Sequence, residues 1–250
     1  MLTLRTYGSS SKGNCYLLSS DTTTIMLDCG VKNIEKHLIV NLINGILITH
    51  IHGDHTAGIR TLKDYYNGKY YSHKEVLDIL PVIKGQKTEI EKNKKFKIGD
   101  FEIMPFELHH DVTCYGYLIK DLISNTKLLY ITDTGQIDYQ FKDIDYFLLE
   151  SNCDEDKLTY EDFKEVRLYD THLSKQQTLN FLELNINHNT KKIMLCHIAR
   201  DEEDYLSHEK YIRENLTNFS GEVVALNPHM KNITEIILKE DLEGFDFEWH

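Results

Sequence analysis

The stretch Thr49-His50-Ile51-His52-Gly53-Asp54-His55 places three histidines and one aspartate within six positions. It follows the apolar run Gly45-Ile46-Leu47-Ile48, which has the composition of a buried strand. His50 and His52 are two residues apart, so their side chains point to the same side of an extended segment. The aspartate and the last histidine follow in the turn, where they can serve a second, adjoining position. Because imidazole and carboxylate groups bind zinc and similar cations, we expect a metal site here rather than a polar loop that contains histidines by chance.

A carboxylate or histidine follows an apolar, strand-like run at six places in the chain. These places are Leu27-Asp28, Ile48-Thr49-His50, Leu108-His109-His110, Ile131-Thr132-Asp133, Leu149-Glu150 and Leu195-Cys196-His197. Any one of them is explained by a polar residue where a strand meets solvent. Six together indicate side chains that converge along one edge of a sheet assembly, where rigid strands hold groups in exposed loops.

Length and composition are those of a soluble globular protein, with 250 residues, 41% apolar and 27% charged. We expect one domain over residues 1–250. No apolar run approaches the roughly 18 residues that a membrane span requires, and the first residues carry no signal-peptide pattern. Five scattered cysteines without a Cys-x-x-Cys pair indicate reduced thiols and a cytoplasmic location. The net charge of −12 argues against broad nonspecific nucleic-acid binding unless basic groups are concentrated locally.

Apolar spacing and turn residues predict an alternation of strands and helices. Strands are expected at residues 2–6, 15–19, 24–28, 45–48, 69–72, 101–108, 115–120, 127–132, 145–149, 192–196, 222–226 and 233–238. Helices are expected at residues 34–43, 57–66, 74–80, 175–185 and 202–217. Ser174 is expected to cap the fourth helix, and a Gly/Ser-rich turn is expected at residues 8–14.

The first stretch has the spacing of a His-x-His-x-Asp-His signature, and the chain resembles the metallo-β-lactamase-fold hydrolases. Further motifs, in order along the chain, resemble the YycJ/WalJ branch, which is similar to the tRNase Z and β-CASP nucleases. These motifs are Gly8-Ser9-Ser10-Ser11-Lys12-Gly13-Asn14-Cys15, Leu27-Asp28-Cys29-Gly30, His110-Asp111, Thr132-Asp133-Thr134-Gly135, Leu149-Glu150-Ser151-Asn152, His172-Leu173-Ser174 and Leu195-Cys196-His197-Ile198-Ala199-Arg200. Two positions depart from that pattern, because Thr171 stands where a glycine is usual and Ala199 replaces a serine.

The resemblance implies an α/β fold, a four-layer αββα sandwich of two mixed sheets with helices outside. It also implies two divalent metal ions, zinc or alternatively manganese. By motif, one ion would be held by His50, His52 and His110. The other would be held by Asp54, His55 and His197, with Asp133 between the two ions.

Roles beside the ligands also follow from the resemblance. Asp54, His172 and Glu150 would be the catalytic residues, with His172 near the scissile phosphate and supported by Glu150. Asp28 would support the ligand loop without contacting metal.

Two assignments keep an alternative. His109 and His110 compete for one ligand position, and we favour His110 because Phe106 and Leu108 share its strand phase. Asp133 suits a bridging ligand, since a carboxylate has two oxygens, but it is also a candidate helix cap. The remaining histidines have no comparable setting and are expected at the surface or in packing; they are His37, His73, His188, His208, His229 and His250.

The ligand set implies metal-dependent hydrolysis of phosphodiesters, with DNA or RNA as the expected substrate and partner. The alternative enzyme class is a small-molecule hydrolase that acts on a thioester, a lactone or a cyclic nucleotide, and a non-enzymatic regulatory protein is the third reading. A local basic segment could follow a nucleic-acid backbone or could be a solvated hairpin. Its cations are Lys84, Lys87, Lys92, Lys94, Lys95 and Lys97.

Overall fold

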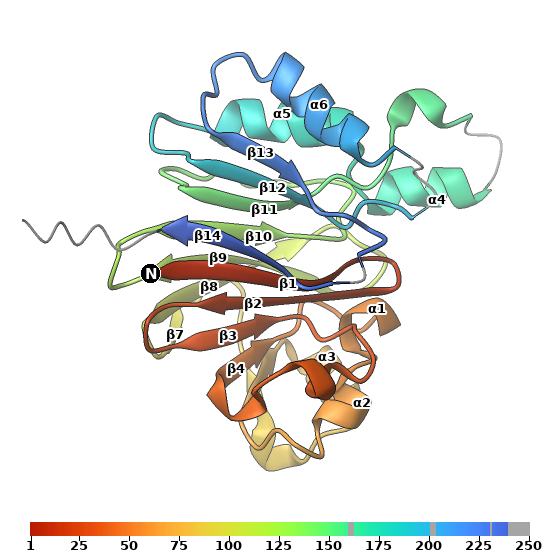
Figure 1. Cartoon of the computed structure of the whole chain (residues 1–250). Helices are drawn as coiled ribbons and strands as arrows, with labels where there is room; N and C mark the ends of the chain where they lie inside the picture. Colours follow the sequence, from red (N-terminus) through yellow and green to blue (C-terminus); the bar gives the residue numbers. More distant parts are fainter. Residues whose placement is uncertain (160–162, 201–203, 231, 240–250) are drawn as a thin grey trace, which may run out of the picture.

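Two seven-stranded sheets form the centre of the computed structural model, which describes residues 1–159, 163–200, 204–230 and 232–239 (Figure 1). The first sheet contains, in spatial order, β14 (Thr234–Lys239), β1 (Leu2–Ser10), β2 (Gly13–Ser19), β3 (Thr24–Leu27), β4 (Ile43–Leu47), β5 (Tyr70–Ser72) and β6 (Lys87–Glu89). The second contains β13 (Glu222–Ala225), β12 (Lys192–Cys196), β11 (Tyr146–Glu150), β10 (Lys127–Ile131), β9 (Cys114–Asp121), β8 (Phe101–Leu108) and β7 (Phe96–Ile98). Both sheets mix parallel and antiparallel pairs, as the resemblance implied.

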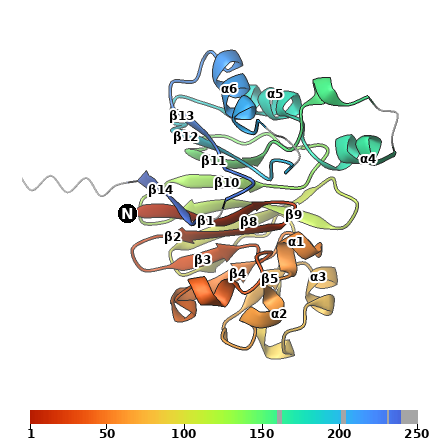
Figure 2. The same ribbon diagram turned by 45° about the vertical axis from the view of Figure 1, so that its right-hand side comes forward.

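Helices cover the outer faces of the two sheets. They are α1 (Gly53–Thr56), α2 (Ile59–Leu62), α3 (Lys74–Ile79), α4 (Phe163–Thr171), α5 (Lys175–Asn185) and α6 (Leu206–Asn215). Two views place α5 and α6 beyond the second sheet and α2 and α3 beyond the first (Figure 2). The predicted four-layer αββα sandwich is confirmed. Among the described residues, every helix is too short or too polar to cross a bilayer.

Three apolar cores separate these layers, and strand alternation divides the side chains among them. In β10, Leu128 and Tyr130 belong to the core between the sheets, whereas Leu129 and Ile131 belong to the core under α5 and α6. In the first sheet, Leu47 of β4 faces the central core, whereas Ile46 packs under the helices. Because successive residues of a strand point to opposite faces, a strand covered on both faces needs a continuous apolar run. This explains the long apolar runs in the sequence.

Two helices expected near the Thr49–His55 stretch were predicted wrongly. Residues 34–43 form two 3₁₀ turns, Ile34–His37 and Val40–Leu42. Ile34 is buried and Leu38 packs against the same core, but Leu42 is 60% exposed, so the expected apolar face does not continue to Leu42. Of the helix expected at 57–66 only the short α2 forms, and α1 ends before that range begins. Between α1 and α2, the Gly58 amide donates to the Cys29 carbonyl, and a Cβ on Gly58 would lie 2.2 Å from the Val31 carbonyl oxygen.

Other elements agree better with the sequence. Helix α5 has the predicted bounds, and Ser174 caps it with a capping box in which Gln177 is the partner. The expected turn at residues 8–14 is mostly strand, because β1 extends to Ser10 and β2 begins at Gly13. Helix α4 and strands β6 and β7 were not predicted. The start expected for the last helix lies outside the described residues, and α6 ends at Asn215.

Candidate metal centre

The six strand ends singled out in the sequence lie together at one edge of the sandwich, where α1 and α4 also lie (Figure 1). Asp28 follows β3, His50 follows β4, His110 follows β8, Asp133 follows β10, Glu150 ends β11 and His197 follows β12. Three of these residues have a left-handed backbone, with φ of 55° at Asp28 and 49° at both Asp133 and His197. A non-glycine residue rarely adopts this conformation, and such residues concentrate where structure serves a site.

His50, His52 and His110 form the first group of side chains. One ring nitrogen from each lies within 4.8 Å of the others, and His52 Nδ1 is 3.3 Å from His110 Nε2. Burial lowers the pKa of His50 well below its ordinary value, and the nearby His55 lowers it further, which favours the neutral imidazole. His109 lies outside this group: it is exposed and pairs with Asp138. The geometry therefore gathers His110 and leaves His109 at the surface.

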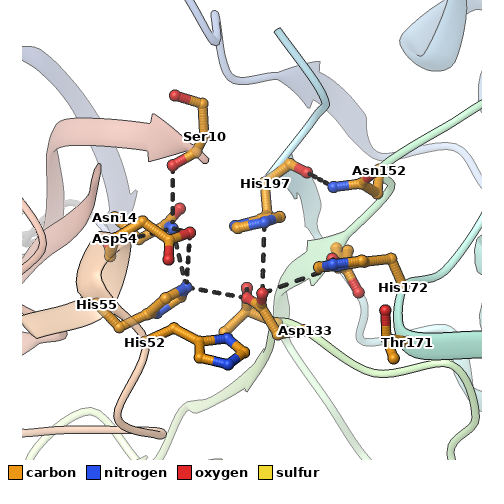
Figure 3. Close-up of polar contacts among 12 residues, drawn as sticks. Ser10, Asn14, His52, Asp54, His55, Asp133, Asn152, Thr171, His172 and His197 are labelled. Carbon is orange, nitrogen blue, oxygen red and sulfur yellow. Dashed lines mark hydrogen bonds and ion pairs between the residues drawn. The ribbon is translucent and has the colours of Figure 1, made fainter. Parts of the chain in front are cut away.

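Asp54, His55, Asp133 and His197 form the second group, also within 4.8 Å of one another. Asp133 is its centre, with Oδ2 at 3.0 Å from His55 Nε2 and Oδ1 at 3.4 Å from His197 Nε2. The same Oδ1 is 4.0 Å from His110 Nε2, so the Asp133 carboxylate lies between the two groups. Figure 3 shows this arrangement around Asp133.

Asp28 lies beneath both groups and is fully buried. Its carboxylate accepts hydrogen bonds from the Thr49 amide at 2.8 Å, from the Tyr130 hydroxyl at 2.6 Å and from His55 Nδ1 at 2.8 Å. The bond to Nδ1 leaves His55 Nε2 directed at Asp133. Burial opposes a charge on His55, but the carboxylates of Asp133, Asp28 and Asp54 outweigh it and hold the pKa of His55 well above its ordinary value.

The backbone of His197 is held from both sides. Its amide donates to Ser9 Oγ at 3.1 Å, and its carbonyl accepts from Asn152 Nδ2 at 2.7 Å. Ser9 belongs to the opposite sheet, and its hydroxyl also accepts from Tyr16 at 2.8 Å. The sequence analysis assigned no role to Ser9 or Asn152, although both belong to motifs that it quoted.

Asn14 is a second residue that sequence reasoning missed. Its buried amide nitrogen lies 3.0 Å from His55 Nε2 and donates to the Ser10 carbonyl at 3.2 Å (Figure 3). It is also 3.5 Å from Asp54 Oδ2. The Gly8–Cys15 motif contained this residue, but an amide at the start of a strand carries no distinctive spacing.

His172 and Glu150 adjoin the second group. His172 Nδ1 is 2.7 Å from Glu150 Oε1 and 3.7 Å from Asp133 Oδ1. Glu150 is fully buried, and its other oxygen accepts from the amides of Thr134 at 3.0 Å and Leu173 at 3.1 Å. Burial lowers the pKa of His172, but the Glu150 carboxylate outweighs this effect and raises the pKa to about 9. The His172 side chain remains 17% exposed, so it can meet a substrate.

Helix α4 reaches the first group through two contacts. The Thr171 carbonyl, at the end of α4, accepts from His110 Nδ1 at 3.0 Å. Arg167 pairs with Asp111, whose Oδ1 lies 3.3 Å from His52 Nε2 and 3.2 Å from His110 Nε2. The Thr171 contact orients the His110 ring so that Nε2 faces the group.

The Lys84–Lys97 segment is largely neutralised by its neighbours. Lys94 pairs with Glu91 at 2.5 Å, Lys95 pairs with Glu102 at 2.8 Å, and Lys92 pairs with Glu107. These pairs favour a solvated segment over a nucleic-acid contact, but the segment is not the expected hairpin, because β6 belongs to the first sheet and β7 to the second.

The side chains fit a pair of divalent cations. His50 Nε2 is buried in the first group and has no hydrogen-bond partner among the described residues. Seven imidazole and carboxylate donors form two adjoining sets, and Asp133 of the second set lies 4.0 Å from His110 Nε2 of the first. Nitrogen and oxygen donors of this kind suit zinc and other first-row cations.

Known proteins similar to this chain include two nucleases. "Exodeoxyribonuclease YycJ" of Bacillus anthracis is 27% identical over 218 residues, which cover 77% of this chain and 81% of that protein. "Exodeoxyribonuclease WalJ" of Streptococcus pneumoniae serotype 2 is 26% identical over 218 residues, which cover 77% of this chain and 80% of that protein. The crystal structure of the metallo-beta-lactamase fold protein YhfI from Bacillus subtilis matches with a TM-score of 0.72 and 19% identity, over 94% of this chain and 98% of that one. The Beta-lactamase superfamily domain matches residues 23–198, and the chain therefore belongs to the beta-lactamase superfamily.

Proposed function

We propose that this protein is a metal-dependent nuclease that hydrolyses phosphodiester bonds in DNA. One observation carries the proposal: two sets of side chains suited to metal binding adjoin each other at Asp133, and His172 lies beside them, hydrogen-bonded to Glu150. A bimetallic site with an adjacent proton donor suits displacement at phosphorus. Similarity to two proteins named exodeoxyribonuclease supports DNA as the substrate.

His50, His52 and His110 would hold one divalent cation. Asp54, His55 and His197 would hold a second, and Asp133, which adjoins both sets, would be shared. When bound, two such cations supply the Lewis acidity that activates a water and neutralises the charge that develops on a phosphate. Zinc suits the nitrogen-rich sets, and manganese is the alternative.

The chain's own groups orient these ligands and manage one proton. Asp28 and the Thr171 carbonyl bind the Nδ1 atoms of His55 and His110, so that each Nε2 faces its set. Glu150 binds His172 Nδ1, which leaves Nε2 as the position from which a proton passes to the leaving oxygen.

Cleavage assays on the metal-loaded protein test the proposal. Labelled single- and double-stranded DNA, the matching RNA and a chromogenic phosphodiester would be incubated with the wild type, His110→Ala and His109→Ala. His109 is a matched control, because it is the adjacent histidine but lies outside both ligand sets. We expect DNA cleavage by the wild type and by His109→Ala, and loss of both cleavage and one metal ion in His110→Ala.

Two results would contradict the proposal. Cleavage of RNA but not DNA would move the substrate to RNA while leaving the reaction in place. Absence of any phosphodiester hydrolysis by protein shown to contain about two metal ions per chain would refute the reaction itself.

A further inference from the structure

A cavity of about 570 Å³ opens beside Asp54, on the outer side of the second ligand set. Three segments far apart in the sequence form it: the turn between β1 and β2, the segment after β3, and helices α1 and α2. Each segment contributes one cation, namely Lys12, Lys32 and Arg60. This cationic cavity is unexpected in a protein with a net charge of −12.

The three cations have no ion-pair partner within 4.0 Å among the described residues, and Asp54 is the only carboxylate in the wall of the cavity that the structure describes. Three lysines of the Lys84–Lys97 segment differ, since Lys92, Lys94 and Lys95 each pair with a glutamate. Cations that gather in one cavity without carboxylate partners repel one another, and an anion relieves that repulsion.

Close backbone packing brings the three segments together. A Cβ on Gly30 would lie 1.6 Å from the Asp54 carbonyl oxygen, so only glycine allows this approach. The Gly30 amide also donates to the Asn14 carbonyl at 2.8 Å. The cavity wall is therefore fixed to the same backbone that positions Asp54 and Asn14.

Neutral donors accompany the cations. Ser11, with a hydroxyl, and Asn33, with an amide, also line the cavity, as does Thr56, whose hydroxyl proton is already used within the protein. Thr56 Oγ1 donates to the His52 carbonyl at 2.9 Å, which ties this wall to the first ligand set. Phosphate oxygens are bound in proteins by this combination of Lys, Arg, hydroxyl and amide groups.

The cavity lies on the side of the centre away from the proton donor. Asp54 belongs to the second ligand set, whereas His172 groups with Asp133, Glu150 and His197. Figure 3 shows Asp54 and His172 on opposite sides of Asp133 and His197. A leaving group that is released toward His172 therefore moves away from the cavity. The part of the strand on the other side of the scissile phosphodiester extends toward the cavity.

We propose that this cavity binds a phosphate of the nucleic-acid strand, adjacent to the scissile phosphodiester and on the side opposite His172. The inference rests on the proposed nuclease function. It makes the cavity the part of the protein that favours binding of a nucleic-acid strand over a small phosphodiester. The ligand chemistry is a phosphate group, either the terminal monoester of a strand or an internal diester.

Binding to a short single-stranded DNA with phosphorothioate linkages, which slow cleavage, tests the inference on the metal-loaded protein. Fluorescence anisotropy at several salt concentrations would compare the wild type with Lys12→Gln/Lys32→Gln/Arg60→Gln. The matched control is Lys92→Gln/Lys94→Gln/Lys95→Gln, which removes the same charge from paired lysines. Elemental analysis of every variant would check that the metal ions are retained.

We expect the cavity variant to bind DNA at least about tenfold more weakly, and its log–log salt slope to fall by about 0.7 for one lost single-strand phosphate contact. The control variant should bind as the wild type does. DNA with a 5′-phosphate, a 3′-phosphate or neither distinguishes a terminal phosphate from an internal one. If the cavity variant loses affinity for only one of the phosphorylated strands, the cavity binds that terminus. If it loses affinity equally for all three, the cavity binds an internal phosphate.

Equal affinity and salt slope in the cavity variant and the wild type would overturn the inference, as would an equal loss in the control variant. The proposed nuclease function is judged separately, because it fails only if the wild type does not hydrolyse nucleic acid. Weaker DNA binding by the cavity variant of a protein that cleaves nothing would support the phosphate site and refute the reaction.

Discussion

Replacement of Asp28 by Asn tests whether a buried carboxylate sets the tautomer of a metal-binding histidine. Asp28 Oδ1 accepts from the Thr49 amide, and Oδ2 accepts from both His55 Nδ1 and the Tyr130 hydroxyl. An asparagine amide has one acceptor oxygen, and its nitrogen only donates. If the oxygen keeps the Thr49 bond, the NH₂ group faces His55 Nδ1. His55 must then offer a lone pair at Nδ1 and carry its proton on Nε2, 3.0 Å from Asp133 Oδ2.

The protonated Nε2 cannot bind a metal ion, so the second ligand set loses one donor. Changes to the partner that orients a metal-binding histidine typically cost 10–100-fold in metal affinity, which is about 1.4–2.7 kcal/mol. We expect a loss of this size in Asp28→Asn for one of two bound ions. Competition with a chelator of known affinity, followed by elemental analysis, would measure it.

Tyr130→Phe is the matched control. It removes one hydrogen bond from the same carboxylate oxygen but leaves the acceptor for His55 in place. Metal affinity of Tyr130→Phe should fall by less than that of Asp28→Asn, since the carboxylate oxygen that accepts from His55 Nδ1 is retained. Wild-type affinity in Asp28→Asn, or an equal loss in both variants, would refute the tautomer argument.

Further predictions concern the histidines. Replacing His197 with Ala should release the second metal ion. The His172→Ala variant should keep both ions and cleave DNA more slowly by a factor of ~10²–10⁴, with much less effect on a substrate that has a good leaving group. Loss of metal from His172→Ala, measured by elemental analysis, would contradict this division of roles. Metal binding should release about one proton at pH 7, because the pKa of His55 is raised in the metal-free protein, and metal affinity should fall as the pH falls. Calorimetry of metal binding in buffers of different ionisation enthalpy would measure the released proton. A binding enthalpy that does not depend on the buffer would contradict the prediction. Burial, and then Lys175, lower the pKa of His208 to about 4. Below pH 6.5 the unfolded chain takes up a proton at His208 that the native chain refuses. Urea titrations between pH 7 and 5 should therefore show the free energy of unfolding of the wild type changing by about 2 kcal/mol less favourably than that of His208→Gln. Equal changes in both would exclude a contribution from His208.

Local rules predicted the elements whose signals lie within a few residues. Ser174 and Gln177 form a capping box three residues apart, and α5 begins there as expected. The two helices placed wrongly failed for a reason outside their own sequence. The spacing of Ile34, Leu38 and Leu42 suits a helix, but Leu42 has no partner surface and stays exposed. Gly58 breaks the next helix because it packs against the segment after β3.

The sequence by itself determined which ligand types this protein carries and that each follows a strand, because apolar runs and the residues that end them are local features. The tertiary structure decided which of them meet. Ser9 holds the His197 backbone across 188 residues, and His55 of α1, Asp28 after β3 and Tyr130 of β10 meet in the fold. Only the folded chain assembles the cationic cavity, since Lys12, Lys32 and Arg60 have no shared spacing. A contact between distant residues depends on how two sheets pack, and no short-range pattern in a sequence encodes that distance.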